Sequence, residues 1–308
     1  MRSLRKSISE YLELRRSLGF RLKQAEWQLE NFARFMRRRR AVHITTKLAL
    51  QWAQQPASTD GNYLAARLGT VRSFARYRIL SDSKTEIPAS DLLPRRRIVS
   101  RPHLYTDEEI GRVLAGSLTL CDGSPFTCLG HHMVYGLLSV TGMRVSEALN
   151  LDLEDVDLDQ GIINIRKTKF GKSRLVPVHE TTCTALKLYR GQRDAFLDGK
   201  VAKPFFISRT GRRIDPSVLD RSFRELTRQL GMCSATDKPR LHDLRHTMAV
   251  EVLRRCYRSG ANPERRLPAL STYLGHTNLN YTYWYLHQNP SLMTEAMRRL
   301  RHRWEALA

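Results

Sequence analysis

The sequence predicts a mainly α-helical protein with a small β-hairpin or sheet, divided into two domains. Apolar residues recur at helical spacing through the first 80 residues and through most of the second half of the chain. Between residues 161 and 178, two short β-rich runs flank a basic turn, which is the pattern of a hairpin. A length of 308 residues also fits two domains of about 100–200 residues each.

Residues 1–80 are expected to form a domain made only of helices. The apolar stripes and caps that indicate them lie at residues 4–12, 25–36, 46–53 and 64–75. Arg67, Arg72 and Arg76 belong to the last of these helices. Basic residues recur on several of the helices with few acidic residues between them, so we expect these arginines to face a polyanion.

The next stretch, residues 81–100, loses the helical period. It contains two prolines, which favour extended backbone, and the run Arg95, Arg96 and Arg97. We therefore expect a basic linker between the two domains.

Residues 101–308 are expected to form a second domain that mixes helices with short strands. Thr106 and Glu109 have the spacing of a capping box, which predicts that a helix begins there. Lys167, Lys169 and Lys172 lie at the tip of the predicted hairpin. The other expected elements are helices over residues 128–140, 181–196, 216–230, 244–256, 267–274 and 291–304, and a strand over residues 205–208.

The charge of the chain points to a polyanionic partner. Lys and Arg total 52 against 30 Asp and Glu, which gives a formal net charge of +22. Nucleic acid is the first candidate, because each phosphate that a protein neutralises releases a counterion. No apolar run reaches the ~18 residues needed to span a bilayer, and charged residues interrupt the first 20 residues, where a signal peptide would lie. We therefore expect a cytoplasmic, nucleoid-associated protein with double-stranded DNA as its partner and no membrane partner.

The five cysteines cannot all pair, and they form no CxxC motif. We expect reduced thiols. Cys121 and Cys128 lie close to His131 and His132 in the sequence, but their spacing fits no common zinc signature, so no metal site is expected.

Four segments carry side chains suited to chemistry. In the first, a glycine turn precedes a helix with Arg144 in its first turn, where a cation opposes the helix dipole unless an anion joins it. The second is the lysine-bearing hairpin tip. In the third, His242 and Arg245 project from one face of a helix. In the fourth, Tyr285 follows His276 by nine residues.

In this order and at these spacings, the four segments resemble the tyrosine recombinase (phage integrase) family. The phrases Gly-Met-Arg-Val-Ser-Glu at 142–147 and His-Asp-Leu-Arg-His-Thr at 242–247 are similar to that family's consensus. The resemblance covers residues 101–301, and residues 1–80 resemble the family's helical core-binding (SAM-like) DNA-binding domain. Residues 258–268 are similar to the transposon-borne members. The resemblance implies a mixed α/β catalytic domain whose catalytic residues are Arg144, Lys169, His242, Arg245, His276 and Tyr285.

The implied activity is that of a site-specific recombinase or integrase of a mobile genetic element, acting through a 3′-phosphotyrosine intermediate. Arg144 and Arg245 would clamp the two non-bridging phosphate oxygens. The phenol of Tyr285, whose ordinary pKa is about 10, needs a proton acceptor, for which His242 is the candidate. A lysine on the hairpin would protonate the leaving 5′-oxygen, and His276 would donate a hydrogen bond to the phosphate. This chemistry requires no metal or cofactor.

Several further residues are assigned supporting roles. Glu147, one turn after Arg144, is expected to fix that guanidinium, and Asp243 to orient the neighbouring backbone or favour the helix start. Lys167 and Lys172, together with the arginines of the fourth helix and the linker, are the DNA-binding candidates.

The resemblance also implies a homotetramer on two DNA sites or a mixed assembly with related recombinases, joined through the final helix, 291–304. Two other functions fit the same residues. A type IB topoisomerase would relax supercoils as a monomer without a specific site. A DNA-binding protein descended from a recombinase would form no covalent adduct.

Overall fold

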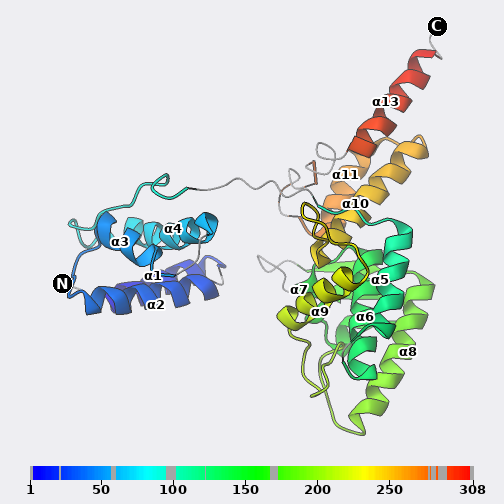
Figure 1. Ribbon diagram of the computed structural model, residues 1–308, viewed down its shortest axis with the longest axis horizontal. Coiled ribbons are helices and arrows are strands. Elements are labelled where there is room, and N and C mark those ends of the chain that lie inside the picture. Colours follow the sequence, from blue (N-terminus) through cyan, green and yellow to red (C-terminus); the bar gives the residue numbers. More distant parts are fainter. Residues whose placement is uncertain are drawn as a thin grey trace. The chain divides into compact units, whose positions relative to one another are not determined.

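The computed structural model describes residues 3–20, 22–56, 60–94, 102–121, 123–166, 173–276, 278, 282–283 and 290–305. The chain divides into two compact units, Met1–Ser100 and Arg101–Ala308. Helices dominate both units (Figure 1), and the β-structure that is described is a three-stranded antiparallel sheet in the second unit. The predicted class, mainly α with a small sheet, is confirmed.

The described part of the first unit is a bundle of α1 (Leu4–Ser17), α2 (Lys23–Arg38), α3 (Thr46–Ala53) and α4 (Gly61–Arg78). Three of these helices begin at a side-chain cap, in which Ser3, Thr45 or Asp60 accepts a hydrogen bond from a backbone N–H of the first turn. The apolar faces meet in one core, where the rings of Phe32 and Trp52 pack edge to face with centroids 5.2 Å apart.

Two arginines that we expected to face DNA are buried in this unit. Arg67 is 3 % exposed, lies 4.0 Å from the centroid of the Trp52 ring and donates to the Trp52 carbonyl (3.1 Å). Arg72 is 9 % exposed and donates to the carbonyls of Pro88 and Ala89, both at 2.7 Å. The prediction is wrong for both arginines, because they lie on the face of α4 that packs inside the unit.

The segment after α4 is not a linker over its whole length. Leu93 is buried in the helical core, and the backbone N–H of Glu86 donates to the carbonyl of Ile44 (2.8 Å). Residues 81–94 therefore belong to the first unit, which they complete by supplying the carbonyls that Arg72 requires.

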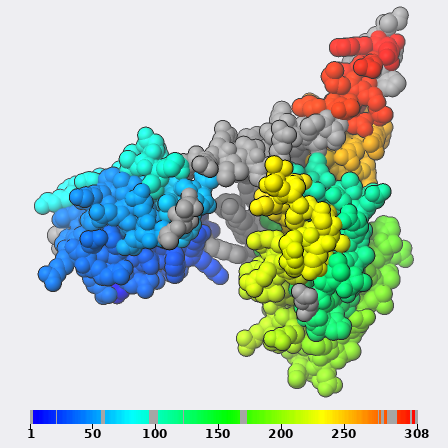
Figure 2. Space-filling view, in the orientation of Figure 1, coloured from blue at the N-terminus to red at the C-terminus, as the bar shows by residue number. Residues whose placement is uncertain are grey.

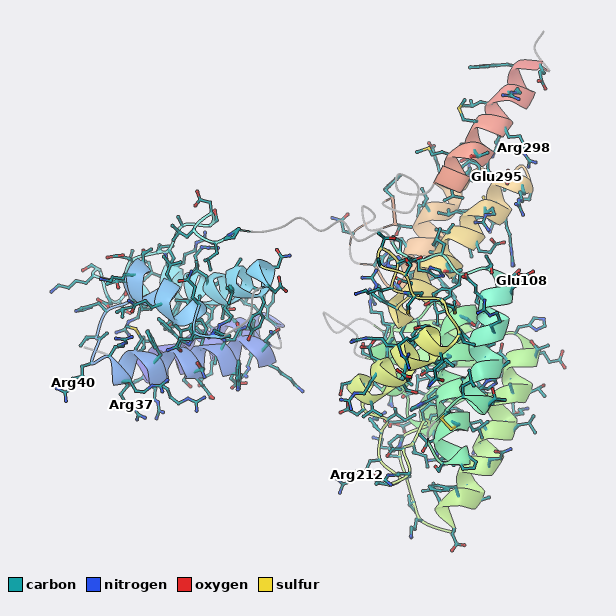
Figure 3. All side chains as sticks on the ribbon, viewed as in Figure 1. Arg37, Arg40, Glu108, Arg212, Glu295 and Arg298 are labelled. Carbon is teal, nitrogen blue, oxygen red and sulfur yellow. A yellow bond between two sulfur atoms is a disulfide. The ribbon has the colours of Figure 1, made fainter. Side chains whose placement is uncertain are left out.

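The exposed basic residues of the first unit lie elsewhere on its helices. Arg76 is exposed on α4, and Arg37 and Arg40 project from the end of α2 (Figure 3). The predicted DNA-binding run Arg95, Arg96 and Arg97 lies outside the described residues.

The second unit has α6 at its centre. Its described elements are α5 (Asp107–Thr119), α6 (Pro125–Thr141), α7 (Val145–Leu149), the 3-10 turn η1 (Leu153–Asp155), β1 (Val156–Asp157), β2 (Ile162–Ile165), β3 (Arg174–Pro177), α8 (Glu180–Leu197), α9 (Pro216–Gln229), α10 (Leu241–Arg258), α11 (Pro263–Leu274) and α13 (Pro290–Glu305). Helix α5 begins at the predicted capping box: Thr106 Oγ1 accepts from the Glu109 N–H, and Glu109 Oε2 accepts from the Thr106 N–H.

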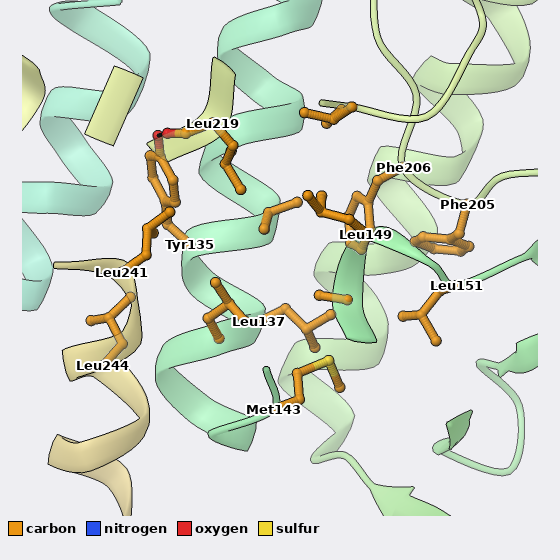
Figure 4. Close-up of a cluster of buried hydrophobic side chains, with 14 of the residues drawn as sticks. Tyr135, Leu137, Met143, Leu149, Leu151, Phe205, Phe206, Leu219, Leu241 and Leu244 are labelled. Atoms are coloured by element: carbon orange, nitrogen blue, oxygen red, sulfur yellow. Dashed lines mark hydrogen bonds between the residues drawn. The ribbon is translucent and has the colours of Figure 1, made fainter. Parts of the chain in front are cut away.

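The core of the second unit surrounds α6 (Figure 4). Leu137 of α6 is buried in the same cluster as Leu149 of α7, and Tyr135 Oη donates to the carbonyl of Leu219 on α9 (3.4 Å). A second cluster joins α10, α11 and the start of α13, through residues such as Leu274 and Leu292. These contacts fix the ends of α6, α10 and α11 relative to one another.

The sheet carries the predicted hairpin. The strands lie in the order β1-β2-β3, and the last pair of β2 and β3 is Ile165 with Arg174. The hairpin tip, residues 167–172, lies outside the described residues. The strand expected over 205–208 is wrong: in that run Ile207 makes only an isolated bridge with Arg213, while the neighbouring phenylalanines fill the core (Figure 4).

Helix α13 is only partly packed against its own unit, and it extends beyond the body of the second unit in Figures 1 and 2. Leu292 is 2 % exposed, Arg258 of α10 donates to Glu295 (3.0 Å), and Arg299 donates to the Gly260 carbonyl (2.8 Å). Its other large apolar side chains among the described residues are exposed: Met293 by 47 %, Met297 by 63 %, Leu300 by 45 % and Trp304 by 68 %.

Cys121 and Cys128 form a disulfide across the loop that enters α6, which corrects the expectation of five reduced thiols. Their Cα atoms are 5.7 Å apart, a spacing at which two cysteines can bond. Among the described residues, no group of three or more His, Cys, Asp and Glu side chains is arranged to hold a metal ion. No helix in the described ranges is long and apolar enough to cross a membrane.

Candidate active site

Arg144 lies at the turn between α6 and α7. Gly142 ends α6 with a φ of 59°, in the left-handed region that favours glycine, and the turn makes Arg144 the N-cap of α7. The Arg144 backbone N–H donates to Glu147 Oε2 (2.9 Å), and its Nη1 donates to Glu147 Oε1 (2.7 Å). The Arg144 side chain is 32 % exposed, so a ligand in solution can reach it.

Arg245 reaches the same region from the second turn of α10, but it is only 2 % exposed. Its Nη1 donates to the carbonyl of Gly142 (2.7 Å), and its Nη2 donates to the carbonyl of Leu274 (2.6 Å). A buried guanidinium is costly unless it is hydrogen-bonded. These two bonds hold Arg245 between the turn that carries Arg144 and the end of α11.

The end of α11 brings the two arginines together. Gly275 ends this helix with a φ of 67°, and its carbonyl accepts a bond from Arg144 Nη2 (3.0 Å). The preceding carbonyl, of Leu274, is the acceptor for Arg245. Carbonyls at a helix C-terminus carry partial negative charge, which suits two neighbouring cations.

His276 follows this cap directly. Its Nδ1 lies 2.8 Å from Thr282 Oγ1. Burial, followed by the charges of Arg245 and Arg144, lowers the pKa of His276 to about 4, so the ring is neutral at pH 7. When the Thr282 hydroxyl donates to Nδ1, the ring proton is on Nε2, which is the tautomer that can donate to an anion from Nε2.

His242 lies in the first turn of α10 and is exposed at the surface. Partial removal of its ring from water, followed by the charge of Arg245, lowers the pKa of His242. A neutral imidazole has one nitrogen able to accept a proton. Its ring packs edge to face on His246, with centroids 4.8 Å apart.

Asp243 is 1 % exposed and faces away from solvent. It accepts bonds from the Arg240 backbone N–H (3.0 Å) and from Arg240 Nε (3.1 Å) and Nη2 (2.9 Å). These contacts fix the point at which α10 begins, and thereby the placement of His242 and Arg245 within its first turns.

The structure thus brings together Arg144, Glu147, His242, Arg245 and His276. Tyr285 lies outside the described residues, as do Lys169 and its neighbours Lys167 and Lys172. The last described pair of β2 and β3 is Ile165 with Arg174, and the three lysines lie between these two residues in the sequence.

Two residues at this site escaped the sequence analysis. Arg174 donates to both oxygens of Glu147, and Thr282 contacts His276. The feature of the sequence that could have indicated Arg174 is that it is a lone cation at the start of an otherwise apolar strand. Thr282 precedes Tyr285 by three residues in the sequence.

Comparison with known proteins identifies the family to which the chain belongs. The model of the phage integrase family matches residues 118–291, which is more than half of the chain. The y4rB protein of Sinorhizobium fredii (strain NBRC 101917 / NGR234), which carries an integrase/recombinase name, is 48 % identical over 99 % of each chain.

The chain belongs to the phage integrase family. It is a tyrosine recombinase, and the tyrosine recombinase XerC of Chlamydia pneumoniae is 29 % identical to it over 71 % of this chain and 65 % of that protein. The fold agrees: the Tn1549 transposon integrase, solved with transposon right-end DNA, superposes with a TM-score of 0.64 at 18 % identity, covering 97 % of this chain and 100 % of that one. Members of this class break and rejoin DNA at specific sites, so the predicted enzyme class is confirmed.

Proposed function

We propose that this recombinase cleaves DNA through Tyr285 and serves the movement of a mobile genetic element. The observation that carries the chemistry is the pair of guanidiniums held on consecutive carbonyls, those of Gly275 and Leu274. A phosphodiester has two non-bridging oxygens whose negative charge grows in the transition state, and Arg144 with Arg245 matches that charge.

In the cleavage step, the Tyr285 oxygen attacks the phosphorus and the bond from phosphorus to the 5′-oxygen breaks. His242 takes the phenol proton, and Lys169 gives a proton to the leaving 5′-oxygen, which departs as a 5′-hydroxyl. His276 donates a hydrogen bond to the phosphate. The 3′-phosphotyrosine conserves the bond energy, so a 5′-hydroxyl from another strand reverses the step and completes exchange without a cofactor.

Two acidic residues support these roles without touching the DNA. Glu147 aims Arg144, since it binds both the backbone and the guanidinium of that residue. Asp243 fixes the start of α10, which carries His242 and Arg245.

DNA contacts come from both units. The candidates in the first unit are now the exposed Arg76 and the arginines at the end of α2, together with Arg95, Arg96 and Arg97. Lys167 and Lys172 contribute from the hairpin tip. A net charge of +22 supports many phosphate contacts. The logarithm of the DNA association constant should therefore fall with the logarithm of the salt concentration, with a slope of about −0.9 for each phosphate neutralised. Because its proposed substrate is double-stranded DNA, we infer that the protein acts at the nucleoid, in the cytoplasm.

Assembly uses the exposed apolar side of α13. Strand exchange between two duplexes requires four sites held together, and the side chains of Met293, Met297, Leu300 and Trp304 are available to a neighbour. We infer a homotetramer on two DNA sites, with a mixed assembly of related recombinases as the alternative.

Two assays performed side by side test the function. A recombinase joins two DNA sites in a synaptic reaction, and we expect recombinant product from a plasmid that carries the element's ends. Relaxation of a supercoiled plasmid without any such sites, and no recombinant product, would instead indicate a type IB topoisomerase. Absence of any covalent adduct with a nicked suicide substrate would indicate a DNA-binding protein without catalytic activity.

A further inference from the structure

Arg174, the first residue of β3, connects three parts of the site. It is almost fully buried, with 11 % of its side chain exposed. Its Nη1 and Nη2 donate to the two carboxylate oxygens of Glu147, at 3.0 and 2.7 Å, and its Nε donates to the carbonyl of Tyr273 near the end of α11 (2.7 Å). One guanidinium, carried by β3, therefore contacts both α7 and α11.

Glu147 is shared evenly between two arginines. Oε1 accepts from Arg144 Nη1 and Arg174 Nη1, and Oε2 accepts from the Arg144 backbone and Arg174 Nη2. Burial alone would raise the pKa of Glu147, but hydrogen bonds from Arg174 and Arg144 lower it to about 2. The carboxylate is thus ionised, and its single negative charge faces two positive charges.

Arg174 also packs against the turn that precedes His276. A Cβ atom built on Gly275 would lie 2.7 Å from Arg174 Nη1 and 3.0 Å from its Cζ, so the guanidinium occupies the space that this glycine leaves open. The carbonyl of Gly275 is the one that Arg144 contacts. Arg174 therefore restrains both partners of Arg144, the carboxylate and the carbonyl.

We infer that Arg174 is a positioning residue, which neutralises Glu147 so that the charge of Arg144 remains available to the scissile phosphate. The inference rests on the proposed function. Arg144 already donates to Glu147 through Nη1 (2.7 Å). Without Arg174, Arg144 would be the only described guanidinium on that carboxylate, so this one ion pair would cancel the charge of Arg144.

The test compares cleavage rates of the full-length protein at saturating DNA, with a suicide substrate that traps the covalent adduct. We expect Arg174→Met to cleave about 10²-fold more slowly, the effect typical of a misplaced catalytic group. The double variant R174M/E147Q should be faster than R174M alone, because a neutral amide no longer competes for Arg144. A purely structural role predicts the opposite order, since each change would remove further contacts.

A second substrate gives an independent readout. A methylphosphonate replaces one charged non-bridging oxygen with a methyl group, so cleavage depends less on guanidinium charge. The penalty of R174M should shrink at least severalfold on this substrate. Equal penalties on both substrates would overturn the inference.

The matched control is Arg193→Met. Arg193 is 1 % exposed and donates to the carbonyl of Pro204 and to Asp194, so its loss also removes the hydrogen bonds of a buried guanidinium, but away from the site. Its variant should keep the wild-type ratio of rates on the two substrates. If the wild-type protein forms no adduct, the proposed function fails. If the wild type forms an adduct and R174M matches its rate, only the inference about Arg174 fails.

Discussion

Arg144 and Arg245 donate from their Nη2 atoms to consecutive backbone carbonyls, those of Gly275 (3.0 Å) and Leu274 (2.6 Å). The two arginines come from segments about 100 residues apart in the chain, and one helix C-terminus aligns them. The left-handed conformation of Gly275 turns its carbonyl toward Arg144. This cap therefore sets the geometry of the phosphate clamp.

Substitution of Gly275 by alanine should damage both stability and cleavage. A residue with a Cβ pays about 1–2 kcal/mol for a φ of 67°, and the new atom would also meet Arg174 Nη1 at 2.7 Å. We expect cleavage by the folded protein to fall about 10²-fold. Gly231→Ala is the control, because Gly231 has the same φ of 67° but no atom within 4 Å of the added Cβ. Equal cleavage by the two variants would contradict the role of the cap.

Arg72 and Arg76 should respond differently to truncation, although they are neighbours on α4. Arg72→Ala removes two hydrogen bonds and leaves the carbonyl of the buried Pro88 without its donor, so it should lower the free energy of unfolding by about 2–4 kcal/mol. Arg76→Ala should change the free energy of unfolding by less than about 0.5 kcal/mol. It should make the slope of the logarithm of the DNA association constant against the logarithm of the salt concentration less steep by about 0.9. Urea unfolding and DNA titrations at several salt concentrations measure both. A stable Arg72→Ala protein with a reduced salt slope would restore Arg72 as a DNA contact.

Stability should fall as the pH is lowered from about 6.5 to 5. The folded-state pKa of His276 and that of His246 are both about 4, below the value of about 6.5 in an unfolded chain. In that window the unfolded state binds more protons than the folded state. Each histidine therefore lowers the free energy of unfolding by up to about 1.36 kcal/mol for each pH unit of acidification. Urea unfolding at pH 7, 6 and 5 should show this decrease in the free energy of unfolding. The decrease with falling pH should be smaller in His276→Gln. An unchanged slope in that variant would contradict a neutral, half-buried His276.

The exposed side of α13 should be needed for recombination between two sites but not for cleavage at one. Met297→Glu places a charge on an apolar surface, and loss of that contact should weaken synapsis at least about tenfold. Arg301→Gln, an exposed polar change on the same helix, is the control. Adduct formation on a single site should be normal in both. A Met297→Glu protein that recombines at the wild-type rate would remove α13 from the assembly.

Local patterns in the sequence predicted the elements well. The stripe from Leu29 to Met36 is buried on α2, the box of Thr106 and Glu109 begins α5, and Gly142 ends α6 as its turn required. Each of these depends on residues within a few positions of one another, so periodicity and capping rules suffice.

Long-range packing could not be predicted in the same way. The number of basic residues on a helix does not reveal which face packs inward, so it does not predict that Arg67 and Arg72 are buried. Packing without a helical period leaves no local pattern, so the sequence predicts a linker where Leu93 in fact packs into the helical core. Arg174 was missed because its partner Glu147 lies 27 residues away on another element.

The central claim is that Tyr285 forms the covalent bond to DNA, and the most direct measurement is to map that bond. A nicked suicide substrate traps the adduct, and mass spectrometry of the digested complex locates the attached nucleotide. We predict that it lies on Tyr285, and that Tyr285→Phe forms no adduct while it retains DNA binding. Tyr283→Phe, a matched change two residues earlier, should form the adduct at the wild-type level. A nucleotide attached to Tyr281 or Tyr283, or an adduct that persists in Tyr285→Phe, would contradict the account.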